Sequence, residues 1–351
     1  MQALVYHGPH QMCWEDWPDP KPGPGDVLLE TCAVGICGSD VHGYTGQSGR
    51  RQPPMVMGHE AVGRVVGVGD GVSPAWCGCT AAVQPIVFCA ACDECRQGTV
   101  QRCRNRRFIG GTLNGAMAER LAVPAANLVP LPEGLSPVQA TLAEPLAVGI
   151  HAATRAGKLS NRTVLIAGSG PIGLLVLVAV RAAGARRVVT TDLVPSRRAL
   201  ARALGADASL DAGASDWAQG LKDLTGGEVD VAFDAVGVQA TFAQALAAIR
   251  PGGVVVAIGG WQTVPLELSR VVTREASVLG TFNFTPAEFT QALQWLAGGR
   301  LDAGRLVSRV CRLDEGAAVF AELASHGGGE GKTVLAGGGS ETLAEARRSP
   351  A

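Results

Sequence analysis

The sequence predicts a mixed α/β protein in which a β-rich segment precedes a doubly wound parallel sheet. Of the 351 residues, 47% are hydrophobic and 47 are glycine, which is typical of large buried cores with many tight turns. Residues 1 to about 145 contain short strand-like runs separated by glycine and proline. From about residue 163, apolar strand-like runs alternate with helical stretches, as repeated βα units do. The length favours two domains.

The β-rich segment is expected to begin with four strands bounded by turn residues. These expected strands are residues 3–6, 26–34, 61–68 and 81–87. The prolines at 18, 20, 22 and 24 predict an extended stretch rather than a linker between domains.

The second part begins with a strand at residues 163–167, a continuous apolar run of the kind buried on both faces of a sheet. A helix at 172–183 follows and is stopped by Gly184. Further strands are expected at 187–191, 229–233, 254–258 and 278–282, and further helices at 196–204, 241–249 and 286–297. Strands near 306–310 and 333–336 are expected to return to the first domain, and the tail from Gly337 is expected to be mobile.

Charge and hydropathy exclude several classes of partner. The 30 basic and 31 acidic residues nearly cancel, and no basic run favours nucleic acid or an anionic membrane surface. The first residues, 1–6, lack the basic and apolar regions of a signal peptide. The longest apolar stretch, residues 174–180, is far shorter than the ~20 residues that span a membrane. The sequence therefore predicts a soluble cytoplasmic protein without nucleic-acid or membrane partners.

A closed set of metal ligands lies in the first domain. Its spacing is Cys89-x2-Cys92-x2-Cys95-x7-Cys103, which places four thiols within fifteen residues. Four cysteines complete a tetrahedron around one ion and leave no vacant position, which suits a structural zinc. A reducing compartment and the Cys-x2-Cys spacing favour metal over disulfides.

An open set of ligands consists of Cys37 and the adjacent pair His59-Glu60. A thiolate, an imidazole and a carboxylate leave room for water or a substrate oxygen, as a catalytic zinc requires. A packed core imidazole is the alternative interpretation of His59.

A dinucleotide-binding pattern follows the strand at 163–167. It comprises Gly168, Gly170, Pro171, Ile172 and Gly173 and opens a helix. The first glycine permits a tight turn, the second lets the backbone approach a pyrophosphate, and the third permits close packing of the helix on the strand. The free N–H groups and the dipole of the helix N-terminus favour the phosphates.

Asp192 stands nineteen residues beyond Gly173, at the end of the second strand of this sheet. A carboxylate there accepts the ribose hydroxyls of adenosine and repels a 2′-phosphate, which favours NAD over NADP. Arg197 and Arg198 complicate this prediction, because a nearby arginine accommodates that phosphate. We expect the carboxylate of Asp192 to outweigh the two arginines, so that the protein prefers NAD.

These motifs together resemble the zinc-containing medium-chain dehydrogenases, and in particular the polyol branch typified by sorbitol (L-iditol 2-) dehydrogenase. The resemblance covers the chain from its start to about Gly337. Five ordered motifs carry it: Gly35-Ile-Cys-Gly-Ser-Asp-Val-His42, Gly58-His59-Glu60, the four-cysteine set, Glu144-Pro-Leu-Ala-Val-Gly-Ile-His151 and Gly168-x-Gly-x-x-Gly173.

The resemblance implies a GroES-like β-rich catalytic domain in two pieces, with a Rossmann domain inserted between them. The expected domains are residues 1–147 (catalytic, first part), 148–275 (NAD-binding), 276–337 (return to the catalytic domain) and 338–351 (a mobile tail). The active site would lie in the cleft between the domains, and members are usually homodimers or homotetramers.

Mapped onto this sequence, the resemblance makes Cys37, His59 and Glu60 ligands of the catalytic zinc. Glu144 would be a supporting carboxylate or an alternating ligand, with a helix-starting carboxylate as the plain alternative. The four-cysteine set would hold the structural zinc. Zinc acts as a Lewis acid that lowers the pKa of a substrate hydroxyl, and the cofactor then accepts a hydride.

Two residues near Cys37 are expected to carry the substrate proton to water: Ser39 by hydroxyl rotation, and His42 by passing the proton outward. Further cofactor contacts are weaker expectations, because each could equally reflect packing at a strand end. They are Ile172 and Arg197, then Ile258-Gly259-Gly260 and Thr281-Phe282-Asn283 by the nicotinamide.

Departures from the polyol branch affect the expected substrate pocket. Gly43 stands where sorbitol dehydrogenases carry an aromatic residue, and Asn283 stands where they carry an arginine expected to touch the polyol. We nevertheless expect Ser39, Tyr44 and Asn283 to provide polar groups near the cleft.

The predicted function is NAD- and zinc-dependent oxidation of a secondary hydroxyl on a polyol, sugar acid or similar small alcohol to a ketone. The alternative within the enzymes is a threonine-type or simple secondary-alcohol dehydrogenase. More remote alternatives are a non-catalytic crystallin-like binding protein of the same fold and a zinc-free quinone reductase.

Overall fold

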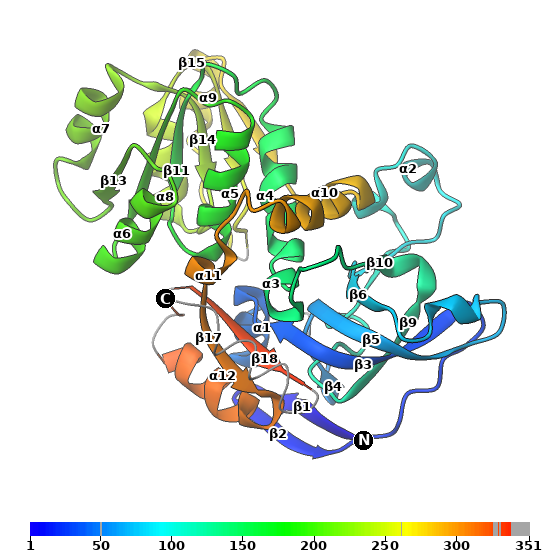
Figure 1. Cartoon of the computed structure of the whole chain (residues 1–351). Coiled ribbons are helices and arrows are strands. Elements are labelled where there is room, and N and C mark those ends of the chain that lie inside the picture. Colours follow the sequence, from blue (N-terminus) through cyan, green and yellow to red (C-terminus); the bar gives the residue numbers. More distant parts are fainter. Residues whose placement is uncertain (50, 261, 326–328, 330, 338–351) are drawn as a thin grey trace. The chain divides into compact units, whose positions relative to one another are not determined.

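The chain forms two compact units in a computed structural model that describes residues 1–49, 51–260, 262–325, 329 and 331–337 (Figure 1). Unit 1 comprises Met1–Glu144 and Thr285–Ala351, and unit 2 comprises Pro145–Phe284. Residues 338–351, for which a mobile tail is expected, lie outside the described residues. Within the described part of the chain, no helix is long and apolar enough to cross a membrane.

Unit 1 is built on a seven-stranded sheet. Its order is β10 (Leu128–Pro130), β6 (Thr80–Val83), β5 (Glu60–Val68), β3 (Asp26–Gly35), β18 (Lys332–Ala336) and β17 (Val307–Arg312), and β9 (Arg120–Pro124) also pairs with β3. β17 and β18 are parallel to each other, and the other pairs are antiparallel. The sheet therefore joins the start of the chain to its C-terminal part (Figure 1).

Smaller elements complete unit 1. A three-stranded sheet contains β2 (Gln11–Asp16), β1 (Gln2–Gly8) and β4 (Met55–Val56), and a ribbon pairs β7 (Ile86–Val87) with β8 (Arg107–Phe108). The helices are α1 (Gly38–Tyr44), α2 (Asp93–Arg96), α3 (Pro137–Ala140), α10 (Pro286–Ala297), α11 (Ala303–Leu306) and α12 (Gly316–Ser325). The helix α4 (Ala143–Arg155) spans the division between the units.

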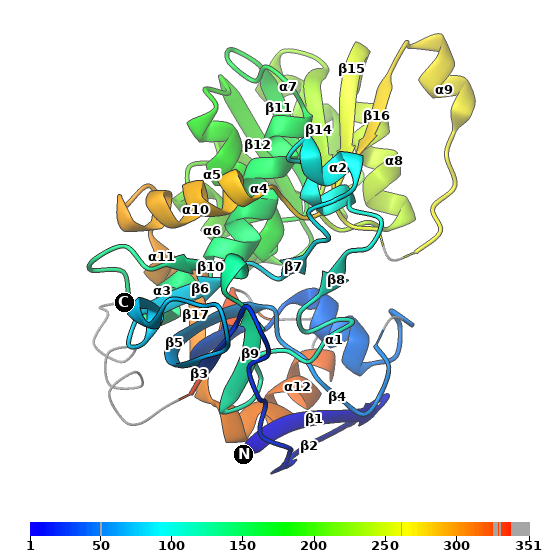
Figure 2. The same ribbon diagram turned by 90° about the vertical axis from the view of Figure 1, so that its right-hand side faces the viewer.

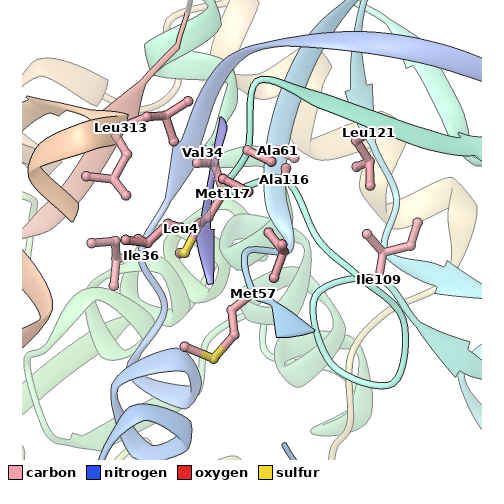
Figure 3. Packing of buried hydrophobic residues seen from close by; sticks show 14 of the residues in the cluster. Leu4, Val34, Ile36, Met57, Ala61, Ile109, Ala116, Met117, Leu121 and Leu313 are labelled. Carbon is pink, nitrogen blue, oxygen red and sulfur yellow. The ribbon is translucent and has the colours of Figure 1, made fainter. Parts of the chain in front are cut away.

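The core of unit 1 lies beside the loop that enters β5. Leu4, Val34, Met57 and Met117 are each fully shielded from solvent and pack together (Figure 3). They come from β1, β3 and two loops, so this core fixes segments that are far apart in the sequence. Burying such side chains contributes about 1.5–3 kcal/mol each.

Unit 2 is a six-stranded parallel sheet (Figure 2). Its order is β13 (Ala208–Asp211), β12 (Arg187–Asp192), β11 (Thr163–Ala167), β14 (Val229–Asp234), β15 (Ile249–Ala257) and β16 (Ser277–Gly280). Its helices are α5 (Pro171–Ala182), α6 (Pro195–Ala203), α7 (Trp217–Thr225), α8 (Gln239–Ala248) and α9 (Leu268–Thr273). This is the strand order 3-2-1-4-5-6 of a dinucleotide-binding sheet, which confirms the predicted fold class.

Most predicted elements appear within one or two residues of their expected bounds, but β15 begins five residues before the expected strand at 254–258, and another expected strand was wrong. The expected strand at 81–87 is divided into β6 and β7. Pro85 separates them, and because proline has no N–H to donate, it interrupts a ladder.

Candidate functional site

Three neighbouring strands bring the polar residues of unit 1 to one edge of the sheet. Gly35 at the end of β3 pairs with Glu60 at the start of β5 and with Val334 near the start of β18. Cys37, two residues past β3, therefore lies beside Glu60 and close to the first residue of β18, Lys332. The three strands can be followed in Figure 1.

The ligand atoms of Cys37, His59 and Glu60 lie within 4.8 Å of one another, so the structure brings the predicted open set together. His59 and Glu60 are buried and Cys37 is partly exposed. The loop before His59 is fixed by backbone pairing: Gly115 N–H donates to Val56 O at 2.8 Å, and Met117 N–H donates to Met57 O at 3.0 Å. A methyl group at Gly115 would come within 2.3 Å of Gly58 O, so only glycine fits this approach.

Glu60 forms a buried ion pair that the sequence did not predict. Lys332 Nζ lies 2.5 Å from Glu60 Oε1 and donates a second hydrogen bond to Ile36 O at 3.3 Å. Burial lowers the pKa of Lys332, but Glu60, Cys37 and Glu144 together outweigh this effect, and the net shift is upward. The available signal was a lysine at the start of an otherwise apolar final strand.

The other oxygen of Glu60 is available for a metal. Glu60 Oε2 is buried and has no hydrogen-bond partner among the described residues. A Cβ at Gly35 would stand 2.1 Å from it, so the carboxylate occupies space that only glycine leaves open.

Asp40, in the first turn of α1, contacts two residues of the open set. Its Oδ2 accepts a hydrogen bond from Cys37 N–H at 3.2 Å, and its Oδ1 lies 3.4 Å from His59 Nδ1. Its Oδ1 also pairs with Arg51 Nη2 at 2.9 Å. Burial opposes ionisation of Asp40, but the charges of His59 and Arg51 together hold its pKa below the usual value.

His59 is held with one nitrogen towards Asp40. Burial acts against the charged imidazole, but Asp40 and Cys37 raise the pKa of His59 well above its ordinary value. Because Nδ1 faces Asp40, Nε2 is the nitrogen available to a metal, which would bind the imidazole in its neutral form. The ring packs against Phe108 with a centroid separation of 5.1 Å, a contact absent from the predictions.

Glu144 is buried in the first turn of α4 and stands beside this cluster. Burial raises its pKa to about 7; Glu60 and Asp40 also raise it, whereas His59 and Lys332 act in the opposite direction. Its carboxylate is not one of the atoms grouped within 4.8 Å, so the structure places it next to the open set and not within it.

The open set fits a zinc ion chemically. A thiol, an imidazole nitrogen and a carboxylate oxygen lie within 4.8 Å of one another, and two of these three side chains are buried. Sulfur, nitrogen and oxygen donors in this number are those of catalytic zinc sites, which keep one position for water or substrate.

The four cysteines of the closed set converge as well. The sulfurs of Cys92 and Cys95 are 3.5 Å apart, those of Cys89 and Cys103 are 3.5 Å apart, and those of Cys89 and Cys95 are 3.9 Å apart. Sulfurs at about 2.3 Å from one zinc ion in a tetrahedron would be about 3.8 Å apart. Backbone N–H groups of Ala91 and Cys92 lower the pKa of Cys89 to about 6, which favours the thiolate that zinc requires.

In unit 2, the glycine pattern forms the turn between β11 and α5. A Cβ at Gly173 would lie 1.9 Å from Gly168 O, so this glycine permits the close approach of helix and strand. A Cβ at Gly170 would meet nothing within 4 Å, which leaves open space beside the helix N-terminus. Pro171 and Ile172 occupy the first two positions of α5. This is the geometry expected for a pyrophosphate site.

Asp192 lies at this turn. Its two oxygens accept the N–H groups of Ser169 and Val194, both at 2.8 Å. Each carboxylate oxygen has a further lone pair for a ribose hydroxyl. Arg198 donates to the carbonyls of Asp192 and Leu193 at 2.9 Å and lies 3.2 Å from Asp211 Oδ2, whereas Arg197 lies in the first turn of α6. The Asp211 carboxylate therefore offsets the charge of one of the two arginines.

The remaining predicted cofactor residues follow the carboxyl ends of β15 and β16. Ile258 N–H donates to Asp234 O at 2.9 Å, and a Cβ at Gly259 would lie 2.4 Å from Val236 O, so two loops touch backbone to backbone. Gly260 has open space beside it. Thr281 Oγ1 and Asn283 Nδ2 are buried without hydrogen-bond partners among the described residues, and Phe282 is exposed. Ligands of such sheets bind at these strand ends.

The expected proton path is not joined by direct hydrogen bonds. His42 Nδ1 contacts Gln47 Oε1 at 2.9 Å, and no hydrogen bond links Ser39 to His42 within the described chain. Tyr44 was wrongly expected near the cleft. It is buried in the core of unit 1, where its ring packs against Phe320 of α12 and its hydroxyl donates to His10 O.

Comparisons with known proteins agree with this geometry. Residues 23–133 match the alcohol dehydrogenase GroES-like domain, and residues 171–298 match the zinc-binding dehydrogenase domain. Sorbitol dehydrogenase of Bacillus subtilis (strain 168) is 32% identical over 322 residues, which are 90% of this chain and 91% of the relative. L-Idonate 5-dehydrogenase of Vitis vinifera is 37% identical over 308 residues, which are 82% of this chain and 81% of the relative.

Solved structures show the same relationship. A candidate zinc-binding dehydrogenase of Sinorhizobium meliloti 1021, bound to NADP, has a TM-score of 0.86 and 32% identity, and the match covers 95% of this chain and 98% of that one. The chain belongs to the zinc-binding alcohol dehydrogenase family, and the resemblance predicted from its motifs is confirmed.

The position of Asp192 predicts the choice of cofactor. Asp192→Asn should raise the KM for NAD about tenfold or more, since a charge-assisted hydrogen bond contributes about 1.5–3 kcal/mol. The same change should lower the KM for NADP relative to the KM for NAD, because the amide does not repel a phosphate. Steady-state kinetics with both cofactors measure this effect, and a melting curve controls for damage to the turn. A wild-type enzyme that prefers NADP would contradict the prediction.

Proposed function

We propose that this dehydrogenase oxidises a secondary hydroxyl of a polyol or sugar acid to a ketone, with zinc and NAD as cofactors. The carrying observation is the buried cluster at the ends of β3, β5 and β18. There one ligand atom from each of Cys37, His59 and Glu60 lies within 4.8 Å of the other two, and Glu60 keeps one oxygen without a hydrogen-bond partner among the described residues.

We assign the catalytic zinc to Cys37, His59 and Glu60, with Glu144 as a supporting or alternating carboxylate, and the structural zinc to Cys89, Cys92, Cys95 and Cys103. The catalytic ion, when bound, supplies a Lewis acid that lowers the pKa of a substrate hydroxyl. The protein supplies the orientation of the ligands. Lys332 fixes one oxygen of Glu60, and Asp40 faces Nδ1 of His59, so each ligand presents one defined atom.

The residues around the ligands have further roles in this proposal. Ser39 would accept the substrate proton and His42 would pass it towards solvent through an intervening water molecule, because no hydrogen bond joins the two side chains within the described residues. Burial keeps bulk water from the ligands, since His59, Glu60 and Glu144 are all at most 5% exposed. The glycine turn of unit 2 would hold the dinucleotide, Asp192 would accept its ribose hydroxyls, and the cofactor would supply the hydride acceptor.

The substrate class rests on the relatives together with the polar groups of this chain. The matches to sorbitol dehydrogenase and L-idonate 5-dehydrogenase cover 90% and 82% of this chain. The unpartnered amide of Asn283 follows β16, and its backbone φ of 51° is one that asparagine tolerates. A buried donor without a partner favours a ligand that completes its hydrogen bond.

Asn283 provides the test of the substrate class. Asn283→Gly, which retains the backbone conformation, should lower kcat/KM for sorbitol or L-idonate about tenfold, the equivalent of one lost hydrogen bond. The loss for 2-propanol or cyclohexanol should be smaller, because neither has a second hydroxyl to bind. NADH formation on the four substrates measures both effects.

Two results would count against this assignment. One is an equal loss on both kinds of substrate. The other is a wild-type enzyme that favours cyclohexanol over every polyol and sugar acid tested, which would favour a simple secondary-alcohol dehydrogenase.

We further propose that two copies associate through the β16 edge of unit 2. Among the described strands, β16 is bonded only to β15, so its outer edge is unpaired. Leu268 and Val272 of the preceding helix α9 are 62% and 66% exposed. An unpaired edge strand beside exposed apolar side chains favours pairing with a second copy about a two-fold axis.

The double variant Leu268→Glu/Val272→Glu tests this interface. It should convert a dimer into a monomer, because two carboxylates per copy would have to be desolvated at the contact. Sedimentation at several concentrations gives the mass, and Val66→Glu in unit 1, also an exposed valine, is the control. A monomeric wild type, or a dimer that survives the double change, would refute the interface.

A further inference from the structure

We propose that Arg51 is a positioning residue for the catalytic metal. Its guanidinium fixes Asp40 in the orientation in which that carboxylate contacts both Cys37 and His59. The inference rests on the proposed function, because it concerns the ligands of the same metal.

The contacts form a chain from Arg51 to the ligands. Arg51 Nη2 pairs with Asp40 Oδ1 at 2.9 Å, and the side chains are 9% and 0% exposed. That same oxygen faces His59 Nδ1 at 3.4 Å, while Oδ2 accepts the N–H of Cys37 at 3.2 Å. One carboxylate therefore sets both a ring orientation and the start of α1, and a single guanidinium holds it.

Two glycines make room for the arginine. A Cβ at Gly43 of α1 would lie 2.7 Å from Arg51 Cγ, and a Cβ at Gly111 would lie 2.8 Å from Arg51 Nη1. A side chain at either position would displace Arg51 from its present path to Asp40, and the displacement would be larger at Gly43, where the stem of the arginine lies. Gly43 is the departure noted in the sequence, where sorbitol dehydrogenases carry an aromatic residue. The glycine and the arginine are thus two parts of one arrangement.

Arginine suits this position better than lysine would. A fully buried carboxylate requires a compensating charge and hydrogen bonds, or its burial is strongly unfavourable. The planar guanidinium supplies both and restricts the rotation of the carboxylate, whereas an ammonium supplies charge without a fixed direction. With Arg51 absent, Asp40 would keep the hydrogen bond from Cys37 N–H, but its Oδ1 would lose the guanidinium that holds it beside His59.

The test measures metal affinity at the two zinc sites separately. Arg51→Met and Arg51→Lys are dialysed against graded chelator, and the zinc remaining per chain is determined. Arg51→Met should weaken the open site about 10–100-fold, the usual effect of removing a group that orients a metal ligand. Arg51→Lys should lie between Arg51→Met and the wild type.

Two comparisons make the result specific. The four-cysteine site should keep its zinc in both variants and thereby reports intact folding of unit 1. Arg64→Met breaks another arginine–carboxylate pair of unit 1, at 2.7 Å from Glu30 but largely exposed, and should leave both affinities unchanged.

The outcomes separate this inference from the proposed function. A wild type that binds zinc only at the four cysteines refutes the proposed metal site itself. A wild type with two zinc ions and an Arg51→Met variant of unchanged affinity overturns only the role of Arg51. If Arg51→Met does not fold, Arg51→Lys decides the question, and an affinity equal to that of the wild type overturns the inference.

Discussion

The balance of buried charge at one edge of the unit 1 sheet is the constraint on which the site depends. The groups that can be negative there are Cys37, Asp40, Glu60 and Glu144. The protein supplies positive charge from Arg51 and Lys332, each paired with one carboxylate, and from the imidazole of His59 when it is protonated. A divalent cation, which requires that imidazole in its neutral form, would take over its charge and balance the remaining anions. Because unpaired buried charges are strongly destabilising, the site is most favourable when such an ion is bound.

This balance of charge depends on residues from both ends of the chain. Cys37 and Glu60 lie early in the sequence, whereas Lys332 lies in β18, which follows unit 2 in the sequence. The register of β18 on β3 then places the ammonium against Glu60 Oε1. Bringing together residues so far apart in the sequence has an entropic cost, and the buried cluster around Met57 and Met117 stabilises the loops beside this contact.

Local patterns explain what the sequence predicted. The four cysteines and the glycine turn are readable because their chemistry depends on spacing within one short segment. Arg51 and Lys332 were not foreseen, since their importance arises only when strands and loops distant in sequence are paired. Tyr44 was misplaced for a similar reason: the direction of α1 turns it towards α12 and the core. The strand expected at 81–87 is interrupted at Pro85. The proline was visible in the sequence and could have predicted this interruption.

The balance of charge at this site can be tested by measuring the metal content of the purified, active enzyme. We expect about two zinc ions per chain. A mild chelator should remove the ion of the open site together with activity, and added zinc should restore both, while the ion at the four cysteines stays bound. Because the buried anions would lose their compensation, the depleted protein should also melt at a lower temperature. A fully active chain with only one metal ion, or none, would contradict the account.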